Sequence, residues 1–242
     1  MNAPARASSE RVETEEVTFT VSGMIEGARQ GVPLAISFVP FGAVFGVMAR
    51  QAGLTFGEAT LMTLIVYAGA SQFITLGLWV PPLSIANIIL TSSIVNLRYL
   101  LMGAALRPWF SKLSPLKAYG SIFFISDGSW AMAMREFASG KRDGAYLLGS
   151  SLAQFVALGS ATVVGYVLGA AIKDPARWGL DFVATAVFAA LLVGMWKGKS
   201  DLLPWLSSAT VAIVCAQWLP GKWYVFVGGL VGSLIGAFGD EN

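Results

Sequence analysis

Long apolar runs, each near the 20 residues that a helix needs to cross a bilayer, follow one another after residue 20. Short separators rich in Pro, Gly, Lys and Arg lie between them. The expected spans are Val32–Ala49, Gly57–Trp79, Leu83–Leu106, Leu116–Met134, Ala145–Ile172, Leu180–Trp196, Leu202–Leu219 and Tyr224–Phe238. The pattern predicts an all-α integral membrane protein with seven or eight transmembrane helices, because a polar triplet interrupts the span from Leu116.

The first 20 residues differ from the rest of the chain. They are polar and of mixed charge and lack the apolar core of a signal peptide, so we expect residues 1–20 to be a disordered tail. Residues 21–242 are expected to form a single polytopic membrane domain. Lys and Arg divide eight against seven between the two sides of an eight-span topology, which assigns no orientation.

The composition of the chain supports a membrane location and excludes several kinds of catalytic and cofactor site. The chain is 55% hydrophobic and 12% charged, whereas soluble domains are about 25% charged. With no histidine, a lone Cys215 and no phosphate-binding loop, we expect no metal, no cofactor, no ATP hydrolysis and no His-based catalysis. A net charge of +2 without a basic block argues against a nucleic-acid partner. The protein is therefore not expected to be an enzyme.

The chain matches itself at an offset of 82 residues. Pro33 falls on Pro115, and Gln72-Phe73 falls on Gln154-Phe155, without a gap between these landmarks. Chance matching of apolar sequence is the alternative, but Pro and Gln are uncommon inside spans, so we favour a duplication of residues 32–106 and 116–196, followed by two C-terminal spans.

Three crossings in each repeat would invert the second repeat relative to the first. A 3+3 inverted repeat with interrupted helices and a midplane site is a recurrent plan of transporters. We expect the first span to be interrupted at Pro40-Phe41-Gly42 and the fourth at Ser126-Asp127-Gly128. Such interruptions free backbone polar groups, which are tolerated only against protein or a wet cavity.

Three strings resemble the AzlC family, the large subunits of bacterial two-component exporters of branched-chain amino acids. They are Pro40-Phe41-Gly42 through Gly46, Ala68-Gly69-Ala70-Ser71-Gln72-Phe73, and Asn96-Leu97-Arg98-Tyr99-Leu100-Leu101-Met102-Gly103-Ala104. The resemblance implies a bacterial inner-membrane permease that exports valine, leucine, isoleucine or similar amino acids with a small AzlD-type membrane subunit. The family often has an acidic pair near the fourth span, whereas this chain reads Asp127-Gly128, which weakens the transfer of proton coupling.

Polar residues inside the spans are the candidate substrate site. Gln72 and Gln154 either bridge helices or offer hydrogen bonds to an amino acid. The apolar side chain of such an amino acid would require a pocket lined by apolar residues. Arg98 costs about 2.5–3.5 kcal/mol at a helix centre, so it either snorkels to an interface or contacts a carboxylate. The expected substrate-binding residues are Pro40, Phe41, Gly42, Gly69, Ser71, Gln72, Asn96, Arg98, Tyr99 and Gln154.

Asp127 is the one acidic residue near the middle of an expected span. It is a candidate proton-coupling residue, and the alternative is a cap at the start of a half-helix. GxxxG motifs at Gly42–Gly46 and Gly165–Gly169, and the glycines at 228, 232 and 236, indicate close helix packing. The leading interpretation is a secondary exporter. A membrane scaffold without a substrate path and an intramembrane enzyme are the alternatives, and a scaffold needs no symmetric polar pair.

Overall fold

A computed structural model describes residues 16–172, 198–218 and 223–239, together with scattered positions between 177 and 196. The elements in these parts are helices. An isolated parallel β-bridge pairs Thr18 with Asp143, outside the helices. Residues 1–15 of the expected tail and most of the sixth expected span, Leu180–Trp196, lie outside the described residues. Within the described ranges, three helical segments are long and apolar enough to cross a membrane by length and composition: Val21–Gln51, Ile85–Phe110 and Ala145–Leu168.

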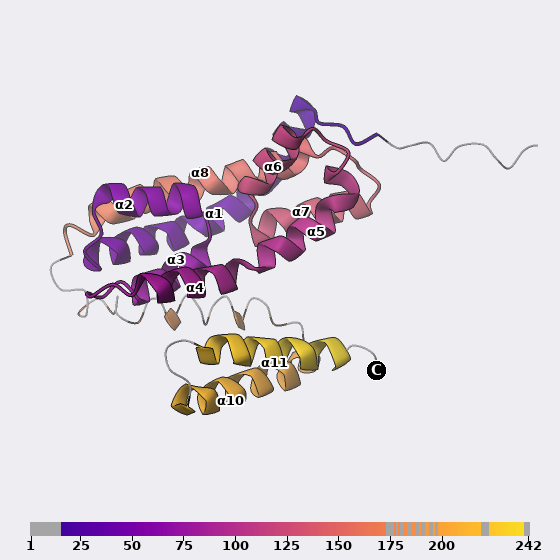
Figure 1. Cartoon of the computed structure of the whole chain (residues 1–242). Helices are drawn as coiled ribbons and strands as arrows, with labels where there is room; N and C mark the ends of the chain where they lie inside the picture. The colour runs from indigo at the N-terminus through magenta and orange to yellow at the C-terminus, as the bar shows by residue number, and fades with distance from the viewer. Residues whose placement is uncertain are drawn as a thin grey trace, which may run out of the picture. The chain divides into compact units, whose positions relative to one another are not determined.

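The helices follow the order of the expected spans, with several spans divided (Figure 1). They are α1 (Val21–Gln51), α2 (Phe56–Leu61), the π-helical turn η1 (Met62–Val66), α3 (Gly69–Gly77), α4 (Ile85–Asn96), α5 (Arg98–Phe110), α6 (Pro115–Phe123), α7 (Asp127–Ala138), α8 (Ala145–Leu168), the 3-10 turn η3 (Lys199–Asp201), α10 (Leu202–Trp218) and α11 (Trp223–Gly239). The fourth span is interrupted as expected, between Phe123 and Asp127.

The expected interruption of the first span is wrong. Helix α1 runs without a break through Pro33 and Pro40. Both prolines lie on the exposed face of α1, so the carbonyls that they leave without a donor do not have to be buried against another helix. Gly42, which we expected to lie in the break, instead packs against α8: a Cβ there would lie 2.6 Å from the carbonyl oxygen of Leu158.

The second span has an interruption that the sequence did not reveal. Helix α2 continues into η1, and the chain then breaks at Tyr67 and Ala68 before α3 begins at Gly69. Tyr67 has φ 41°, in the left-handed region that a bulky residue rarely adopts. Strained backbone of this kind costs about 1–3 kcal/mol and concentrates at functional sites.

The described residues form two compact units. Unit 1 combines the described residues up to 38 with 99–157, and unit 2 combines 39–98 with the described residues from 158 onward. The core of unit 1 includes Leu106, Phe110, Phe137 and Leu147, and that of unit 2 includes Phe45, Leu54, Phe73 and Leu76. Each unit takes residues from both expected repeats, and the inverted symmetry itself stays a prediction.

Glycines bring α1 and α8 into backbone contact within each unit. In unit 1, a Cβ on Gly27 would lie 2.1 Å from the Tyr146 carbonyl oxygen. In unit 2, a Cβ on Gly46 would lie 2.1 Å from the Thr162 carbonyl oxygen. Residue numbers rise together along the two helices, so they run parallel. Helices α1 and α8 correspond to the first and fifth expected spans. The two spans run in the same direction if each of the three spans between them crosses the membrane once.

The glycines of the last span serve an intrachain contact. Helices α10 and α11 form an antiparallel hairpin (Figure 1). A Cβ on Gly228 would lie 2.8 Å from the Cβ of Ala212, and one on Gly232 would lie 2.7 Å from the Cβ of Ser208. This confirms the packing role expected from the glycine spacing, as do the contacts of Gly42, Gly46 and Gly165 in unit 2.

One carboxylate, that of Asp143, lies at the start of both parallel helices. Its Oδ1 accepts hydrogen bonds from the N–H of Thr20 at 3.1 Å and of Ala145 at 3.0 Å, and its Oδ2 accepts the Thr20 hydroxyl. Negative charge is favourable there because N-terminal N–H groups of a helix have no intrahelical acceptor. The last residues of the expected tail, through Thr18 and Thr20, are thereby held against the loop between α7 and α8.

Replacing Asp143 with alanine is expected to lower the free energy of unfolding by about 1–2 kcal/mol, the usual loss on removing an N-terminal cap. Thermal unfolding of the detergent-solubilised protein measures the change. Glu16→Ala, which removes an exposed carboxylate four residues before Thr20, is the control and should leave the midpoint unchanged. Equal midpoints for the two variants would show that the double cap contributes nothing.

Candidate functional site

The interruption in the second span leaves the start of α3 without a side-chain cap. The N-cap residue is Ala68, whose methyl group accepts no hydrogen bond, and the first backbone bond of the helix runs from the Gln72 N–H to the Ala68 carbonyl at 2.9 Å. The N–H groups of Gly69, Ala70 and Ser71 therefore have no acceptor within the helix. An uncapped helix N-terminus favours a negatively charged group, such as a carboxylate.

Aromatic side chains of α1 cover this helix start within unit 2. The Phe41 ring lies 2.4 Å from where a Cβ on Gly69 would be, so only glycine fits there without movement of the ring. The rings of Phe41 and Phe73 meet edge to face at 4.8 Å, and Phe45 meets Phe73 at 5.7 Å. The helix start thus has apolar walls as well as free N–H groups.

Polar side chains on neighbouring elements surround the same turn. We call Thr63, Ser71, Gln72, Asn96 and Thr162 the unit 2 polar cluster. Nε2 of Gln72 donates to Thr63 Oγ1 at 3.1 Å, and Nδ2 of Asn96 donates to Ser71 Oγ at 3.3 Å. The Thr63 hydroxyl oxygen, Oγ1, lies 3.4 Å from Oγ1 of Thr162 of α8. Gln72 is 2% exposed, so its amide is well shielded from solvent.

Two amide oxygens of the unit 2 polar cluster have acceptor capacity to spare. Oδ1 of Asn96 is buried and has no hydrogen-bond partner among the described residues. Oε1 of Gln72 likewise accepts no hydrogen bond from the part of the chain that the structure describes. Buried polar groups are nearly always paired, so the buried oxygen of Asn96 marks a position for a further donor, and Gln72 Oε1 offers a second acceptor in the same cluster. An ammonium group is a donor of this kind.

A second polar group of residues, in unit 1, joins the interruption of the fourth span to α8. We call Ser126, Ser129, Ser151 and Gln154 the unit 1 network. The hydroxyl of Ser126 donates to Oε1 of Gln154 at 2.5 Å, and the Ser151 hydroxyl donates to Ser129 Oγ at 2.9 Å. Nε2 of Gln154 donates to the Ser150 carbonyl at 3.1 Å. Gln154, Ser129 and Ser151 are fully buried.

Asp127 lies beside this network as the first residue of α7, where its side chain is exposed. The cap of α7 is Ser126, whose hydroxyl accepts from the Ser129 N–H at 3.1 Å, while the Ser129 hydroxyl accepts from the Ser126 N–H. The structure therefore assigns the capping role that we considered for Asp127 to Ser126. A carboxylate in the first turn is still favoured by the helix dipole.

The structure brings half of the expected site residues together. Phe41, Gly69, Ser71, Gln72 and Asn96 meet in unit 2. Pro40 lies on the exposed face of α1, Gly42 packs on α8, and Arg98 begins α5. Tyr99 and Gln154 belong to unit 1, where Tyr99 packs against the core around Leu106.

The sequence pattern did not indicate Thr63 and Thr162 of the unit 2 polar cluster or Ser129 of the unit 1 network. Single hydroxyl residues in apolar helices commonly bond to their own backbone, as Thr63 does to the Ala59 carbonyl, and so carry no signal by themselves. Ser151 precedes Gln154 by three residues, and that small polar pairing was the available hint.

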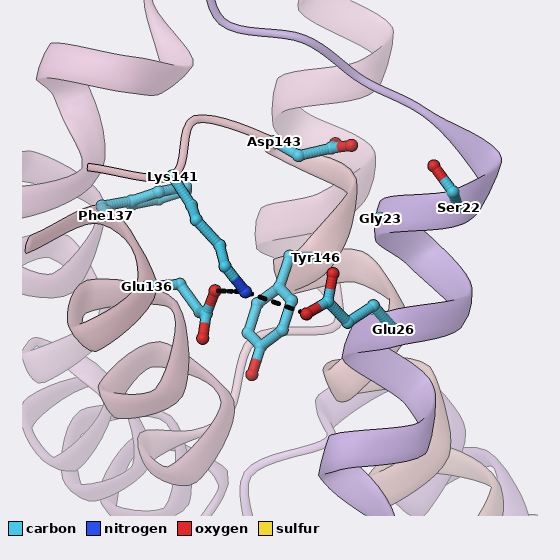
Figure 2. Close-up of a pocket in the computed structure, with 8 residues that line it drawn as sticks. All are labelled: Ser22, Gly23, Glu26, Glu136, Phe137, Lys141, Asp143 and Tyr146. Atoms are coloured by element: carbon cyan, nitrogen blue, oxygen red, sulfur yellow. Dashed lines mark hydrogen bonds and ion pairs between the residues drawn. The ribbon is translucent and has the colours of Figure 1, made fainter. Parts of the chain in front are cut away.

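A cavity of about 100 Å³ lies in unit 1 at the N-terminal ends of α1 and α8 (Figure 2). It is lined by Ser22, Gly23, Glu26, Glu136, Phe137, Lys141, Asp143 and Tyr146. Nζ of Lys141 lies 2.9 Å from Glu26 and 2.7 Å from Glu136, so the ammonium joins α1 to α7. The hydrogen bond to Glu136, followed by that to Glu26, raises the pKa of Lys141 above its ordinary value, which keeps the lysine charged. None of the expected site residues lines this cavity.

Among the described residues, no three Cys, Asp or Glu side chains lie close enough to hold a metal ion. Both polar groups of residues consist of amides and hydroxyls. The unit 2 polar cluster, with a buried Asn96 oxygen that is unpaired within the described part of the chain, suits reversible binding of a small polar molecule through hydrogen bonds.

One protein-family model matches more than half of the chain. The family described as "AzlC protein" matches residues 33–172. The inner membrane protein YgaZ of Escherichia coli is 26% identical over 184 residues, which cover 74% of this chain and 75% of YgaZ. An uncharacterized membrane protein of Archaeoglobus fulgidus is 28% identical over 176 residues, covering 72% and 76%. The branched-chain amino acid transport protein AzlC of Bacillus subtilis is 22% identical over 166 residues, covering 68% and 65%. No solved structure matches the chain.

Proposed function

Because the chain belongs to the AzlC family, a family of multi-pass inner-membrane proteins with a role in transport, we propose that it is the large subunit of a secondary exporter of branched-chain amino acids. It would act with a small AzlD-type membrane subunit, and Asp127 would couple transport to protons. The observation that carries the proposal is the uncapped start of α3 under Phe41, at the interruption of the second span.

The chemistry of that site suits an apolar amino acid. Free N–H groups at the start of α3 would bind the substrate carboxylate. Oδ1 of Asn96 and Oε1 of Gln72 would accept the ammonium group. The rings of Phe41, Phe45 and Phe73 would contact the aliphatic side chain. Helices interrupted at a binding site are the usual arrangement in secondary transporters.

Replacing Gln72 with leucine is expected to raise the apparent KM for leucine or valine efflux at least about tenfold. A hydrogen bond to a charged group is worth about 1.5–3 kcal/mol, and about 1.4 kcal/mol is tenfold in affinity. Efflux of radiolabelled amino acid from loaded cells that produce the chain and its small subunit measures the change.

The same substitution at Gln217, which is exposed on α10, is the matched control and should keep the wild-type rate. Loading with lysine or glutamate tests the substrate class, because the aromatic walls predict little efflux of either. Wild-type efflux of leucine by a normally inserted Gln72→Leu protein would remove the start of α3 from the substrate path.

A further inference from the structure

The two glutamines that the internal repeat aligns have different surroundings. Gln72 donates to Thr63 and has a spare oxygen. Gln154 has both ends of its amide engaged, since Ser126 donates to Oε1 and Nε2 donates to the Ser150 carbonyl. Gln154 is also completely buried.

The hydrogens of the unit 1 network can be followed one by one. Each serine hydroxyl has a single hydrogen to donate. That of Ser151 goes to Ser129 Oγ, and that of Ser129 goes to the Ser126 carbonyl at 3.2 Å. The Ser126 hydroxyl has its shortest contact, 2.5 Å, with Gln154 Oε1. No hydroxyl hydrogen of these three serines is left over for a ligand.

The network also fixes the place of the interruption beside Asp127. Ser126 caps α7, and Asp127 is the next residue. The position of a Cβ on Gly128 lies 3.5 Å from Gln154 Oε1, so the first turn of α7 lies against this amide. The remaining partners of the network, Ser150 and Ser151, come from the first two turns of α8.

We infer that Gln154 is a positioning residue rather than a substrate contact, and that with Ser126, Ser129 and Ser151 it fastens the start of α7, and hence Asp127, to α8. Gln72 is then the one member of the aligned pair that binds substrate. Turning the Gln154 amide towards a substrate would break both of its hydrogen bonds, the one from the Ser126 hydroxyl at 2.5 Å and the one to the Ser150 carbonyl at 3.1 Å, which disfavours that motion. The inference rests on the proposed transport function for the role of Asp127, but the fastening itself does not.

The test begins with a measurement that needs no substrate. Asp127→Cys in a Cys215→Ser background reports the position of the α7 start through its rate of reaction with a water-soluble maleimide. Adding Gln154→Leu is expected to change this rate at least about threefold, because the cap residue Ser126 loses its acceptor. Adding Gln72→Leu, the matched substitution in unit 2, is expected to leave it unchanged.

Transport by the chain with its native Asp127 supplies the second measurement. Gln154→Leu is expected to leave the apparent KM for leucine exchange within about twofold of the wild type while altering the pH profile of gradient-driven efflux. Ser151→Ala, which removes only the far donor, should show the same pattern more weakly if Gln154→Leu folds poorly. Gln154→Glu should show the wild-type rate of gradient-driven efflux at low pH, where a buried carboxyl is protonated and keeps both hydrogen bonds.

Each outcome has a distinct meaning. An increase in KM for Gln154→Leu as large as that for Gln72→Leu would overturn the inference by making Gln154 a substrate contact. An unchanged maleimide rate would overturn the fastening. If no variant and no wild-type protein moves branched-chain amino acids, the proposed function fails while the maleimide result still decides the fastening.

Discussion

Replacing Gly165 with alanine is expected to remove most of the folded protein. A Cβ at this position would lie 2.0 Å from the carbonyl oxygen of Ala43 and 2.6 Å from its carbon, and these backbone atoms of α1 cannot rotate away. The two helices would have to separate along unit 2, where Gly46 depends on the same approach to Thr162. Overpacking by movable side chains already costs about 1–3 kcal/mol, so we expect a loss of at least about 3 kcal/mol in the free energy of unfolding.

The yield of monodisperse protein in detergent and its thermal midpoint measure this loss. Gly103→Ala is the matched control, because a Cβ at Gly103 of α5 meets nothing within 4 Å. Alanine is favoured over glycine inside a helix by about 1 kcal/mol, so the control should keep or raise the midpoint. Similar midpoints for the two variants would mean that α1 and α8 do not pack through their backbones.

Replacing Asp127 with asparagine is expected to abolish proton-driven efflux while leaving substrate exchange in place. In the proposed exporter, the carboxylate of Asp127 takes up and releases the coupling proton, and an amide cannot titrate. The substitution should cost little stability, because Ser126 rather than Asp127 caps α7. What it removes is the favourable charge in the first turn, worth about 0.3–1 kcal/mol.

The measurement compares exchange with efflux driven by an imposed pH gradient in proteoliposomes. We expect exchange within about twofold of the wild type and at least a tenfold loss of the gradient-driven component. Asp201→Asn makes the same change just before another helix, α10, and should retain both activities. Gradient-driven efflux at the wild-type rate in Asp127→Asn would leave Asp127 without a coupling role.

Local pattern in the sequence was sufficient for the helices and for one interruption. Apolar runs of bilayer length predicted α1, the α4–α5 segment and α8, since burial in lipid demands such runs whatever the fold. The polar triplet Ser126-Asp127-Gly128 predicted the interruption of the fourth span, because a Ser cap and an early Asp are favoured at the start of a helix. Glycine spacing predicted close packing of α1, α8 and α11.

The other interruption depended on tertiary contacts. Pro40 suggested a break in α1, but the helix continues because that proline faces outward while Gly42 and Gly46 lie against α8. Tyr67 and Ala68 have no composition typical of a break, yet the chain turns there. In the fold, the Phe41 ring packs on Gly69 at the start of α3, and the Gln72 amide donates a hydrogen bond to Thr63 on the other side of the interruption.

The two glutamines illustrate the same division. Their sequence surroundings are alike, with small residues before each, so the sequence by itself determined that both are polar groups inside apolar helices. Only the tertiary structure decided that Ser126, 28 residues away, completes the amide of Gln154, while the amide of Gln72 keeps a spare oxygen. The physical reason is that periodicity and composition indicate whether a residue favours a helix, burial or a hydrogen bond. The partner of that hydrogen bond belongs to a distant segment of the chain, which only tertiary packing brings close.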